Sequence, residues 1–334
     1  MIIDDLIFTV ANAVFTRSNK GLVDAYQQIH GRRPDIANPL RYTERMLWRK
    51  IVDHNPQFVL FTDKLATKEY VRRLCPELAV PRTLWVGRDA DAIPADLLRG
   101  DVYVKASHGC DFNQRIRSGQ WDRAALKKLA DQWLLSIYGQ ESGQWAYSQV
   151  EPKLFVEEAI GDVEAGMLEF NVRVCNGRAI MGSVLGLCKT PNQWAAYFDP
   201  EGNPIPGMSD PEGGPISRLP AGVEVLEPYL RAVQFARQLG TGVDYVRCDF
   251  MWNGRELFGG EITIYPAGGL FEPANASANS VTLNGWDLLQ SNFLKIPQTG
   301  WNRIYAGALK RKLRRQNLVL SKLNPSPASA FDGS

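Results

Sequence analysis

The sequence is poor in the residues that form disulfides and structural zinc sites. It has five cysteines, none of them in a CxxC pair, and three histidines in 334 residues. An odd number of widely spaced cysteines argues against a disulfide framework and favours a reducing compartment, so we expect a cytoplasmic protein. Three scattered histidines (His30, His54 and His108) are too few for a multi-histidine metal site.

Long apolar runs and an excess of one charge are also missing. No run reaches the length of about 18 apolar residues that a membrane-spanning helix needs. The apolar start, MIIDDLIFTVANAVF, has Asp4 and Asp5 where a signal peptide has positive charge, so we predict an amphipathic helix there. The net charge is only +2, so the protein has no strong overall positive electrostatic field that would attract nucleic acid. One basic run, residues 310–315, predicts an exposed helix face or helix end, with a polyanion or membrane-surface contact as the alternative.

The spacing of apolar residues predicts helices at the start of the chain and strands interspersed with helices after it. Helical periods fill most of residues 1–60 and recur over 62–74, 121–139 and 224–240. Strand patterns cover 83–87, 101–107, 113–119 and 153–161, and two hairpins centre on Asn176-Gly177 and Asn253-Gly254. This order predicts an α+β protein with more than one lobe. We expect a long loop over 199–222 and a disordered tail from residue 322.

The second hairpin carries side chains suited to a metal ion and a phosphate group. Arg247 and Asp249 share a face of its first strand, and Glu261 and Thr263 share a face of its second strand. Two carboxylates on neighbouring strands suit Mg²⁺, which takes oxygen ligands together with substrate phosphates. Arg247, one pleat away, suits a phosphate or a developing oxyanion. Ordinary sheet residues with charges on a solvated face are the alternative.

The register of this hairpin decides whether its carboxylates meet. With a two-residue turn at Asn253-Gly254, Asp249 and Glu261 point to opposite sides of the sheet. Convergence requires a loop of odd length or a β-bulge, because one extra residue reverses the facing of every residue after it. Gly259-Gly260 is the natural place for a bulge, and we predict an irregularity there.

Other residues suit a nucleotide, each with a plainer alternative. Lys105 ends a strand that runs into the loop Ser107-His108-Gly109, which can hold phosphate; a lysine lying along apolar surface and a histidine without a role fit as well. Glu157-Glu158 closes a strand whose backbone can meet an adenine edge, and Glu164 follows for ribose hydroxyls. Edge-strand charges that prevent aggregation are the alternative there. By itself, Lys64 predicts an exposed helix residue.

The order of these segments, TDK … YVKASHG … FVEEAIGDVE … EFNVRV … VRCDF … EITIYPAGG, resembles the ATP-grasp superfamily. The chain is most similar to the branch named for the teichuronopeptide-biosynthesis protein, over roughly residues 38–295, including the lead-in DHNPQFVLFTDKLATKEYV. The resemblance implies an ATP-grasp fold, with two α/β lobes that grip ATP and an N-terminal helical lead-in. The implied divisions are a helical region over 1–60, a smaller lobe with the phosphate loop over 61–160, a core lobe with the metal-binding hairpin over 161–300, and a basic helix with a disordered tail over 301–334.

The resemblance also implies roles for the matching positions. Nucleotide binding would fall to Lys64, Lys105, Ser107, His108, Gly109, Glu157, Glu158, Ile160 and Glu164. Asp249, Glu261 and Thr263 would hold Mg²⁺, and Arg247, Lys105 and Arg173 would stabilise charge during the reaction. The substrates would meet Asn171, Arg173, Tyr265, Gly268 and Gly269. Two positions depart from the family pattern: Thr263 replaces the usual asparagine, which leaves a second metal open, and Asn171 replaces a frequent lysine, for which Arg173 is the expected substitute.

The activity that the resemblance implies is an ATP-dependent carboxylate–amine ligation. A substrate carboxylate would take the γ-phosphate of ATP to form an acyl phosphate, and an amine would then displace phosphate to give an amide. The branch points to joining an amino acid or small acid to a peptide, an amino sugar, or a polymer- or carrier-bound precursor of the cell surface. The alternatives are a phosphotransferase acting on a hydroxyl group and a non-catalytic nucleotide-binding assembly protein. A homodimer and closure of the 199–222 loop over the site are left open.

Overall fold

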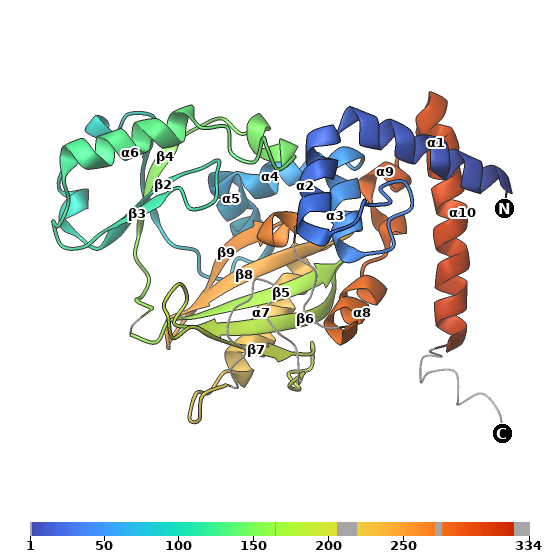
Figure 1. The fold of residues 1–334 in the computed structure, drawn as a ribbon. Helices are drawn as coiled ribbons and strands as arrows, with labels where there is room; N and C mark the ends of the chain where they lie inside the picture. The colour runs from blue at the N-terminus through green and yellow to red at the C-terminus, as the bar shows by residue number, and fades with distance from the viewer. Residues whose placement is uncertain (1, 164, 206–218, 271–275, 324–334) are drawn as a thin grey trace, which may run out of the picture.

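The N-terminal part of the chain is helical and leads into two antiparallel sheets (Figure 1). The computed structural model describes residues 2–163, 165–205, 219–270 and 276–323. The first helices are α1 (Ile2–Ser18), α2 (Lys20–His30), α3 (Tyr42–Ile51), α4 (Gln57–Thr62) and α5 (Lys64–Leu74). The Asp63 side chain accepts hydrogen bonds from the backbone N–H groups of Leu65 and Ala66, which caps α5 and places Lys64 on its first turn.

A four-stranded sheet forms the smaller lobe. Its strands are β1 (Thr83–Gly87), β2 (Val102–Ala106), β3 (Asn113–Ile116) and β4 (Leu154–Glu158), in the antiparallel order β1-β4-β2-β3. One face packs its apolar residues against α6 (Arg123–Leu135) in a separate small core. Because side chains alternate along a strand, the other face carries Tyr103 and Lys105 of β2 beside Glu157 of β4. Helix α6 ends at Leu135 rather than at the expected Gly139.

A five-stranded antiparallel sheet forms the core lobe. Its strands are β5 (Leu168–Cys175), β6 (Arg178–Gly186), β7 (Trp194–Phe198), β8 (Val246–Trp252) and β9 (Leu257–Thr263), in the order β7-β6-β5-β8-β9. Its apolar face is covered by α7 (Leu226–Leu239) (Figure 1). The expected hairpin at Asn176-Gly177 is confirmed, with Cys175 paired to Arg178 and φ values of 48° and 79° in the turn.

The β8–β9 hairpin contains the predicted bulge. Cys248 pairs with Ile262 and Phe250 pairs with Gly259, so one residue of β8 lies opposite two residues of β9. The residue on β8 is Asp249, and the two on β9 are Gly260 and Glu261. The extra residue turns Glu261 to the face that carries Asp249.

The turn of this hairpin differs from the expectation. Trp252 pairs with Leu257, so the loop has the four residues 253–256 instead of two. The Asn253 side chain accepts hydrogen bonds from the backbone N–H groups of Arg255 and Glu256, and this stabilises the longer turn.

The N-terminal helices share one hydrophobic core with the large sheet. Arg49 of α3 is fully buried and donates hydrogen bonds to Asp244 at 2.7 Å and to the carbonyl of Ile264 at 2.9 Å. Its guanidinium lies 4.7 Å from the ring centroid of Trp286. A buried charge persists only with such partners, so Arg49 ties the helices to the core lobe. The division of the chain at residues 60, 160 and 300 stays a prediction.

The remaining elements complete the fold after the sheets. The later helices are α8 (Ala276–Gly285), α9 (Asn292–Lys295) and α10 (Gly300–Leu323), and the short turns are η1 (Ala90–Ala92), η2 (Leu97–Arg99), η3 (Trp145–Gln149), η4 (Pro266–Gly269) and η5 (Leu288–Gln290). The expected tail lies outside the described residues from 324 onward, as do residues 206–218 of the expected long loop. Among the described helices, none combines the length and the apolar character needed to cross a bilayer.

Candidate functional site

The candidate site lies where the polar face of the large sheet meets the loop that follows β2. Lys64 connects these parts, because its Nζ lies 3.4 Å from Glu261 Oε1 and also donates a hydrogen bond to the carbonyl of Gly109. Its backbone N–H donates to the carbonyl of Ser107 at 2.9 Å. The charge of Lys64 lowers the pKa of Glu261, whose side chain is still 53% exposed and open to a ligand.

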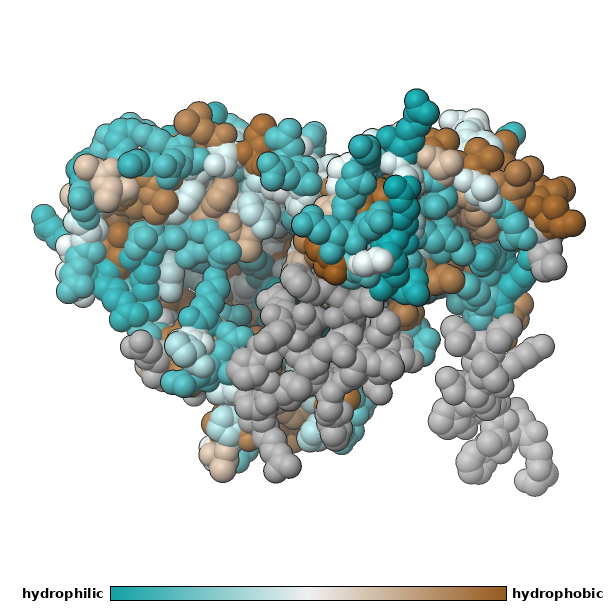
Figure 2. All heavy atoms as spheres, in the orientation of Figure 1, coloured by the Kyte–Doolittle hydropathy of each residue, from teal (hydrophilic) through white to brown (hydrophobic). Residues whose placement is uncertain are grey.

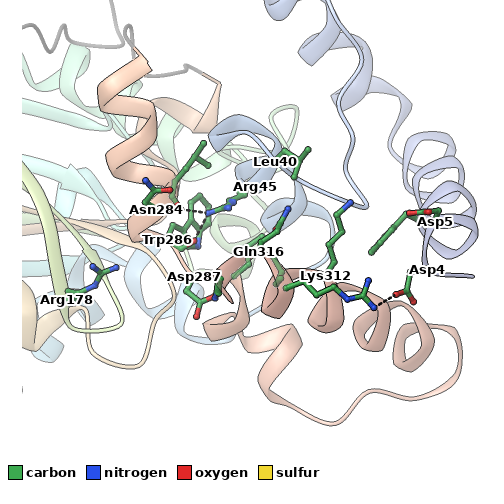
Figure 3. Close-up of a pocket in the computed structure, with 16 residues that line it drawn as sticks. Asp4, Asp5, Leu40, Arg45, Arg178, Asn284, Trp286, Asp287, Lys312 and Gln316 are labelled. Atoms are coloured by element: carbon green, nitrogen blue, oxygen red, sulfur yellow. Dashed lines mark hydrogen bonds and ion pairs between the residues drawn. The ribbon is translucent and has the colours of Figure 1, made fainter. Parts of the chain in front are cut away.

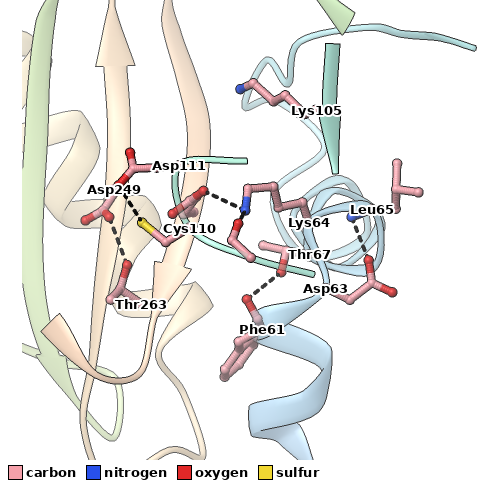
Figure 4. Close-up of polar contacts among 12 residues, drawn as sticks. Phe61, Asp63, Lys64, Leu65, Thr67, Lys105, Cys110, Asp111, Asp249 and Thr263 are labelled. Atoms are coloured by element: carbon pink, nitrogen blue, oxygen red, sulfur yellow. Dashed lines mark hydrogen bonds and ion pairs between the residues drawn. The ribbon is translucent and has the colours of Figure 1, made fainter. Parts of the chain in front are cut away.

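Figure 4 shows Lys64 and Lys105 pointing toward the strands that carry Asp249 and Thr263. The positive charge of Lys105 also lowers the pKa of Glu261, which means that the two lysines and this carboxylate share one electrostatic environment. The fold thus brings together three residues that are far apart in the sequence: Lys64 of α5, Lys105 of β2 and Glu261 of β9.

A buried carboxylate holds Lys105 in place. Lys105 Nζ lies 2.5 Å from Glu157 Oε1, and Lys68 Nζ of α5 contacts the other carboxylate oxygen. Burial alone would raise the pKa of Glu157, but the charges of Lys105 and Lys68 lower it below its usual value. The Glu157 carboxylate therefore forms ion pairs with two lysines. Its expected contact with adenine stays a prediction.

Asp249 is held by two neighbours on the same face of the sheet. It accepts hydrogen bonds from Arg247 Nε at 2.7 Å, from Arg247 Nη2 at 2.8 Å and from Thr263 Oγ1 at 3.0 Å. Burial raises the pKa of Asp249; Arg247 opposes this shift, and the nearby charge of Glu261 reinforces it. The hairpin therefore presents two carboxylates, one of them already oriented.

This donor set fits Mg²⁺ that binds together with phosphate groups. Among the residues that the structure describes, no group of three or more His, Cys, Asp or Glu side chains is placed to hold a metal by itself. Mg²⁺ commonly binds through one or two carboxylates plus substrate phosphates. Asp249 and Glu261 would hold the ion, and Thr263 orients Asp249. A bound Mg²⁺ would neutralise charge on the phosphates.

Strand β5 extends the polar face away from the hairpin. Asn171 pairs with Asp249, and Arg173 pairs with Arg247, across the β5–β8 ladder. The Nη1 atom of Arg173 is buried and has no hydrogen-bond partner within the described ranges. A buried donor without a partner is costly. The substrate contacts expected of Asn171 and Arg173 stay predictions.

The loop after β2 is anchored in the smaller lobe. The backbone N–H of Ser107 donates to the carbonyl of Lys153 at 2.8 Å, and the Ser107 side chain is fully buried. The ring of His108 packs against Phe112, and its Nε2 lies 2.9 Å from the carbonyl oxygen of Trp133. The His108 side chain thus points into the core of the smaller lobe, and the phosphate contacts expected of Ser107, His108 and Gly109 stay predictions.

The segment between the lobes is held by side chains on both sides. Glu158 accepts hydrogen bonds from the backbone N–H and the Nε of Arg82, at 2.8 and 2.6 Å. The carbonyl of Ile160 accepts a hydrogen bond from Asn253 Nδ2 at 3.0 Å, which ties this segment to the β8–β9 loop. Glu164 lies outside the described residues. The nucleotide contacts expected of these three residues stay predictions.

The turn after β9 is supported from the N-terminal helices. Tyr265 is 3% exposed, so it packs in the core, and Gly268 and Gly269 have positive φ values of 63° and 69°. Lys50 of α3 is buried and donates a hydrogen bond to the carbonyl of Gly268 at 2.6 Å. A Cβ on Gly269 would lie 2.9 Å from Met46 Cβ, so only glycine fits. The expected substrate contacts of this turn stay predictions.

Three residues near the site were not expected from the sequence. Lys68 follows Lys64 by one helical turn on α5, and this spacing is a signal that could have found it. Lys50 carries no such signal, because its partner is a carbonyl group more than two hundred residues away. Lys189 forms an exposed ion pair with Asp111 at 2.7 Å, which joins the loop after β2 to the loop between β6 and β7.

The chain has two lobes built on antiparallel sheets. Lys64 and Lys105 face a hairpin that carries an aspartate and a glutamate. These features are those of an ATP-grasp protein. Proteins of this superfamily are ATP-dependent carboxylate–amine ligases. The chain belongs to the TupA-like ATP-grasp family, whose model matches residues 44–280. A comparison with curated protein sequences finds no match.

Solved structures of several enzymes are similar to the chain at low identity. The ATP-grasp ligase PsnB complexed with minimal precursor, Mg and ADP has a TM-score of 0.36 and 13% identity, over 81% of this chain and 66% of that chain. D-alanine–D-alanine ligase from Bacillus anthracis has a TM-score of 0.38 and 14% identity, over 78% and 70%. Phosphoribosylglycinamide synthetase from Anaerococcus prevotii has a TM-score of 0.35 and 13% identity, over 66% and 48%. In another PsnB structure the chain spans 54% of the enzyme's length. Values this low identify no substrate.

Proposed function

We propose that the protein is an ATP-dependent carboxylate–amine ligase that forms an amide bond through an acyl phosphate. One observation carries the proposal: the β-bulge turns Glu261 to the face of Asp249, opposite Lys64 and Lys105. That arrangement supplies oxygen ligands for Mg²⁺ and cations for phosphate, which phosphoryl transfer requires.

The remaining residues fit the two steps of such a reaction. Arg173 binds the substrate carboxylate, which attacks the γ-phosphate, so that ADP leaves and an acyl phosphate forms. Arg247 stabilises the oxyanion that develops when an amine attacks the acyl carbon, and inorganic phosphate leaves as the amide forms. No protein nucleophile takes part in either step.

The substrate classes and the compartment follow from the family branch and from the cysteines. We infer that the donor is an amino acid or a small acid, and that the acceptor is a peptide, an amino sugar or a precursor of a cell-surface polymer. The described cysteines are all free, which fits the cytoplasm. ATP and Mg²⁺ are the expected cofactors.

The test measures ADP and phosphate release with Mg·ATP against a panel of amino acids and amino sugars, singly and in pairs. A ligase gives both products only with a particular pair, together with a new mass equal to the pair minus water. ADP with a phosphorylated acceptor would instead identify a phosphotransferase. Glu261→Gln should abolish turnover, whereas the matched control Glu69→Gln, on the exposed side of α5, should retain it. Full activity of Glu261→Gln would contradict the metal assignment.

A further inference from the structure

A row of large apolar side chains faces solvent along α1. Their exposed fractions run from 42% to 85% for Ile2, Ile3, Leu6, Val10 and Val14. Helical spacing places Ile3, Leu6, Val10 and Val14 on one side of the helix. Figure 2 shows a hydrophobic patch at the end of the molecule where Figure 1 draws the N-terminal part of α1. Contiguous apolar surface of this kind marks an interaction site. We call these five residues the α1 stripe.

A basic helix packs directly against α1. Within the basic run of α10, Arg311 Nη2 lies 2.5 Å from Asp4 Oδ1, and Lys312 Nζ lies 5.3 Å from the ring centroid of Phe8. Arg315 also reaches Asp4, at 3.8 Å. In the described part of the chain, Asp4 is the only carboxylate that pairs with any residue of this run. The run therefore keeps an excess of positive charge beside the apolar α1 stripe.

A cavity of about 930 Å³ opens between α1, α10 and the end of α8 (Figure 3). Cations from three elements line it: Arg45 of α3, Arg178 of β6, and Lys312 and Arg315 of α10. The α1 residues that line it are Asp4, Asp5 and Phe8, which helical spacing places on the opposite side of α1 from the α1 stripe. Arg45 and Arg178 donate hydrogen bonds to backbone carbonyl groups at 2.9 and 3.0 Å, so their charges are not neutralised by these contacts. Of the acidic residues in the lining, Asp4 is paired with arginines and Asp287 caps η5, while Asp5 is exposed.

This surface is separate from the ATP site. All of the residues that line the cavity except Arg45 and Arg178 lie outside residues 44–280, the part that matches the family. The α1 stripe and the basic run also lie outside the part of the chain that the family model matches.

We propose that the α1 stripe and the basic run of α10 form a docking surface for an anionic lipid membrane. An amphipathic helix lies in the plane of a membrane with its apolar side in the headgroup boundary, and basic side chains are attracted to anionic lipids. A second copy of the chain fits less well, because it would bring another basic run toward the first.

The test is co-sedimentation of the full chain with vesicles of phosphatidylcholine alone and of phosphatidylcholine mixed with phosphatidylglycerol. We expect binding to the mixed vesicles only, and loss of binding at high salt. Ile3→Gln/Leu6→Gln should weaken binding at least about tenfold, since it removes the inserted apolar groups. The control Leu135→Gln/Ile137→Gln changes two equally exposed apolar residues of the smaller lobe and should bind normally.

A second pair of variants tests the charge. Lys310→Gln/Arg314→Gln should weaken binding by about fivefold per charge, while Arg99→Gln/Lys128→Gln should not. Thermal melting and ATP turnover of each variant check that the fold and the ATP site are intact. Equal binding by the Ile3→Gln/Leu6→Gln variant, or no binding by the unchanged chain, would overturn the proposal. A concentration-dependent dimer that Ile3→Gln/Leu6→Gln abolishes, without vesicle binding, would overturn it in favour of self-association.

Discussion

Replacing Gly260 by alanine tests whether the bulge builds the metal site. A Cβ at this position would lie 2.8 Å from the carbonyl oxygen of Asp249, whereas ordinary contacts begin at 3.4 Å. The atom that it meets is backbone, so the two strands must separate by about 0.6 Å or the bulge must be lost. Overpacking of this kind costs about 1–3 kcal/mol of unfolding free energy. If the bulge is lost, Glu261 turns to the opposite face and leaves Asp249.

The assay combines urea unfolding with calorimetric binding of ATP in the presence and absence of Mg²⁺. Gly260→Ala should unfold at lower urea and should lose the part of ATP binding that depends on Mg²⁺. Gly259→Ala is the matched control, because its Cβ would meet side chains of Val71 and Leu78 at 3.0 and 3.1 Å rather than backbone. This control should lose stability through packing but keep the register and the Mg²⁺ dependence.

Gly21→Ala serves as a second control, since nothing lies within 4 Å of its Cβ position in α2. It should gain about 0.5–1 kcal/mol from its higher helix propensity. Two results would refute the reasoning: Mg²⁺-dependent ATP binding that survives in Gly260→Ala, or an equal loss of that binding in Gly259→Ala.

Other predictions concern the buried charges around the site. Lys68→Met should lower the unfolding free energy by about 3 kcal/mol in urea titrations, and adding Glu157→Gln should recover part of it, because the single change leaves Glu157 short of one partner. Burial lowers the pKa of Lys50 to about 8, so the folded state holds fewer protons than the unfolded state above that pH. Stability of the unchanged chain relative to Lys50→Met should therefore rise between about pH 8 and 10.5; a flat difference would contradict the shifted pKa. Asp111→Asn should change the unfolding free energy by less than about 1 kcal/mol, since its ion pair with Lys189 is exposed, and a larger loss would show that the pair holds the lobes together.

The bulge could be predicted from the sequence because side chains alternate between the two faces of a strand, so the residue numbers alone give the face of each side chain. Asp249 and Glu261 converge only if one residue is inserted between them, and Gly259-Gly260 is where an insertion is least costly. The length of the turn could not be predicted in the same way. Asn253-Gly254 suits a two-residue turn, but the Asn253 side chain bonds two later N–H groups and extends the loop.

The partners of the lysines could not be predicted, since they depend on packing between distant elements. The strand and loop of Lys105 predict a phosphate site, and nothing in the sequence near Glu157 predicts its ion pairs with Lys68 and Lys105. His108 has a suitable place in the sequence for phosphate, but its ring is buried beside Phe112 and its Nε2 lies 2.9 Å from the carbonyl oxygen of Trp133. Local pattern gives the position of a residue along an element, and the tertiary fold decides which of its groups remain available.

The charged groups of the candidate site are largely satisfied by one another. Lys64 is paired with Glu261, and Arg247 is bound through two hydrogen bonds to Asp249. Ligation of a metal by Asp249 must therefore compete with Arg247, and this competition is relieved if phosphate groups offer the guanidinium a new anion at the same time. The pairing thus favours joint binding of Mg²⁺ and ATP over binding of Mg²⁺ alone. Arg173 has a buried Nη1 without a hydrogen-bond partner in the described residues, so binding of an anion there breaks no existing hydrogen bond of that atom but requires the groups that cover it to move.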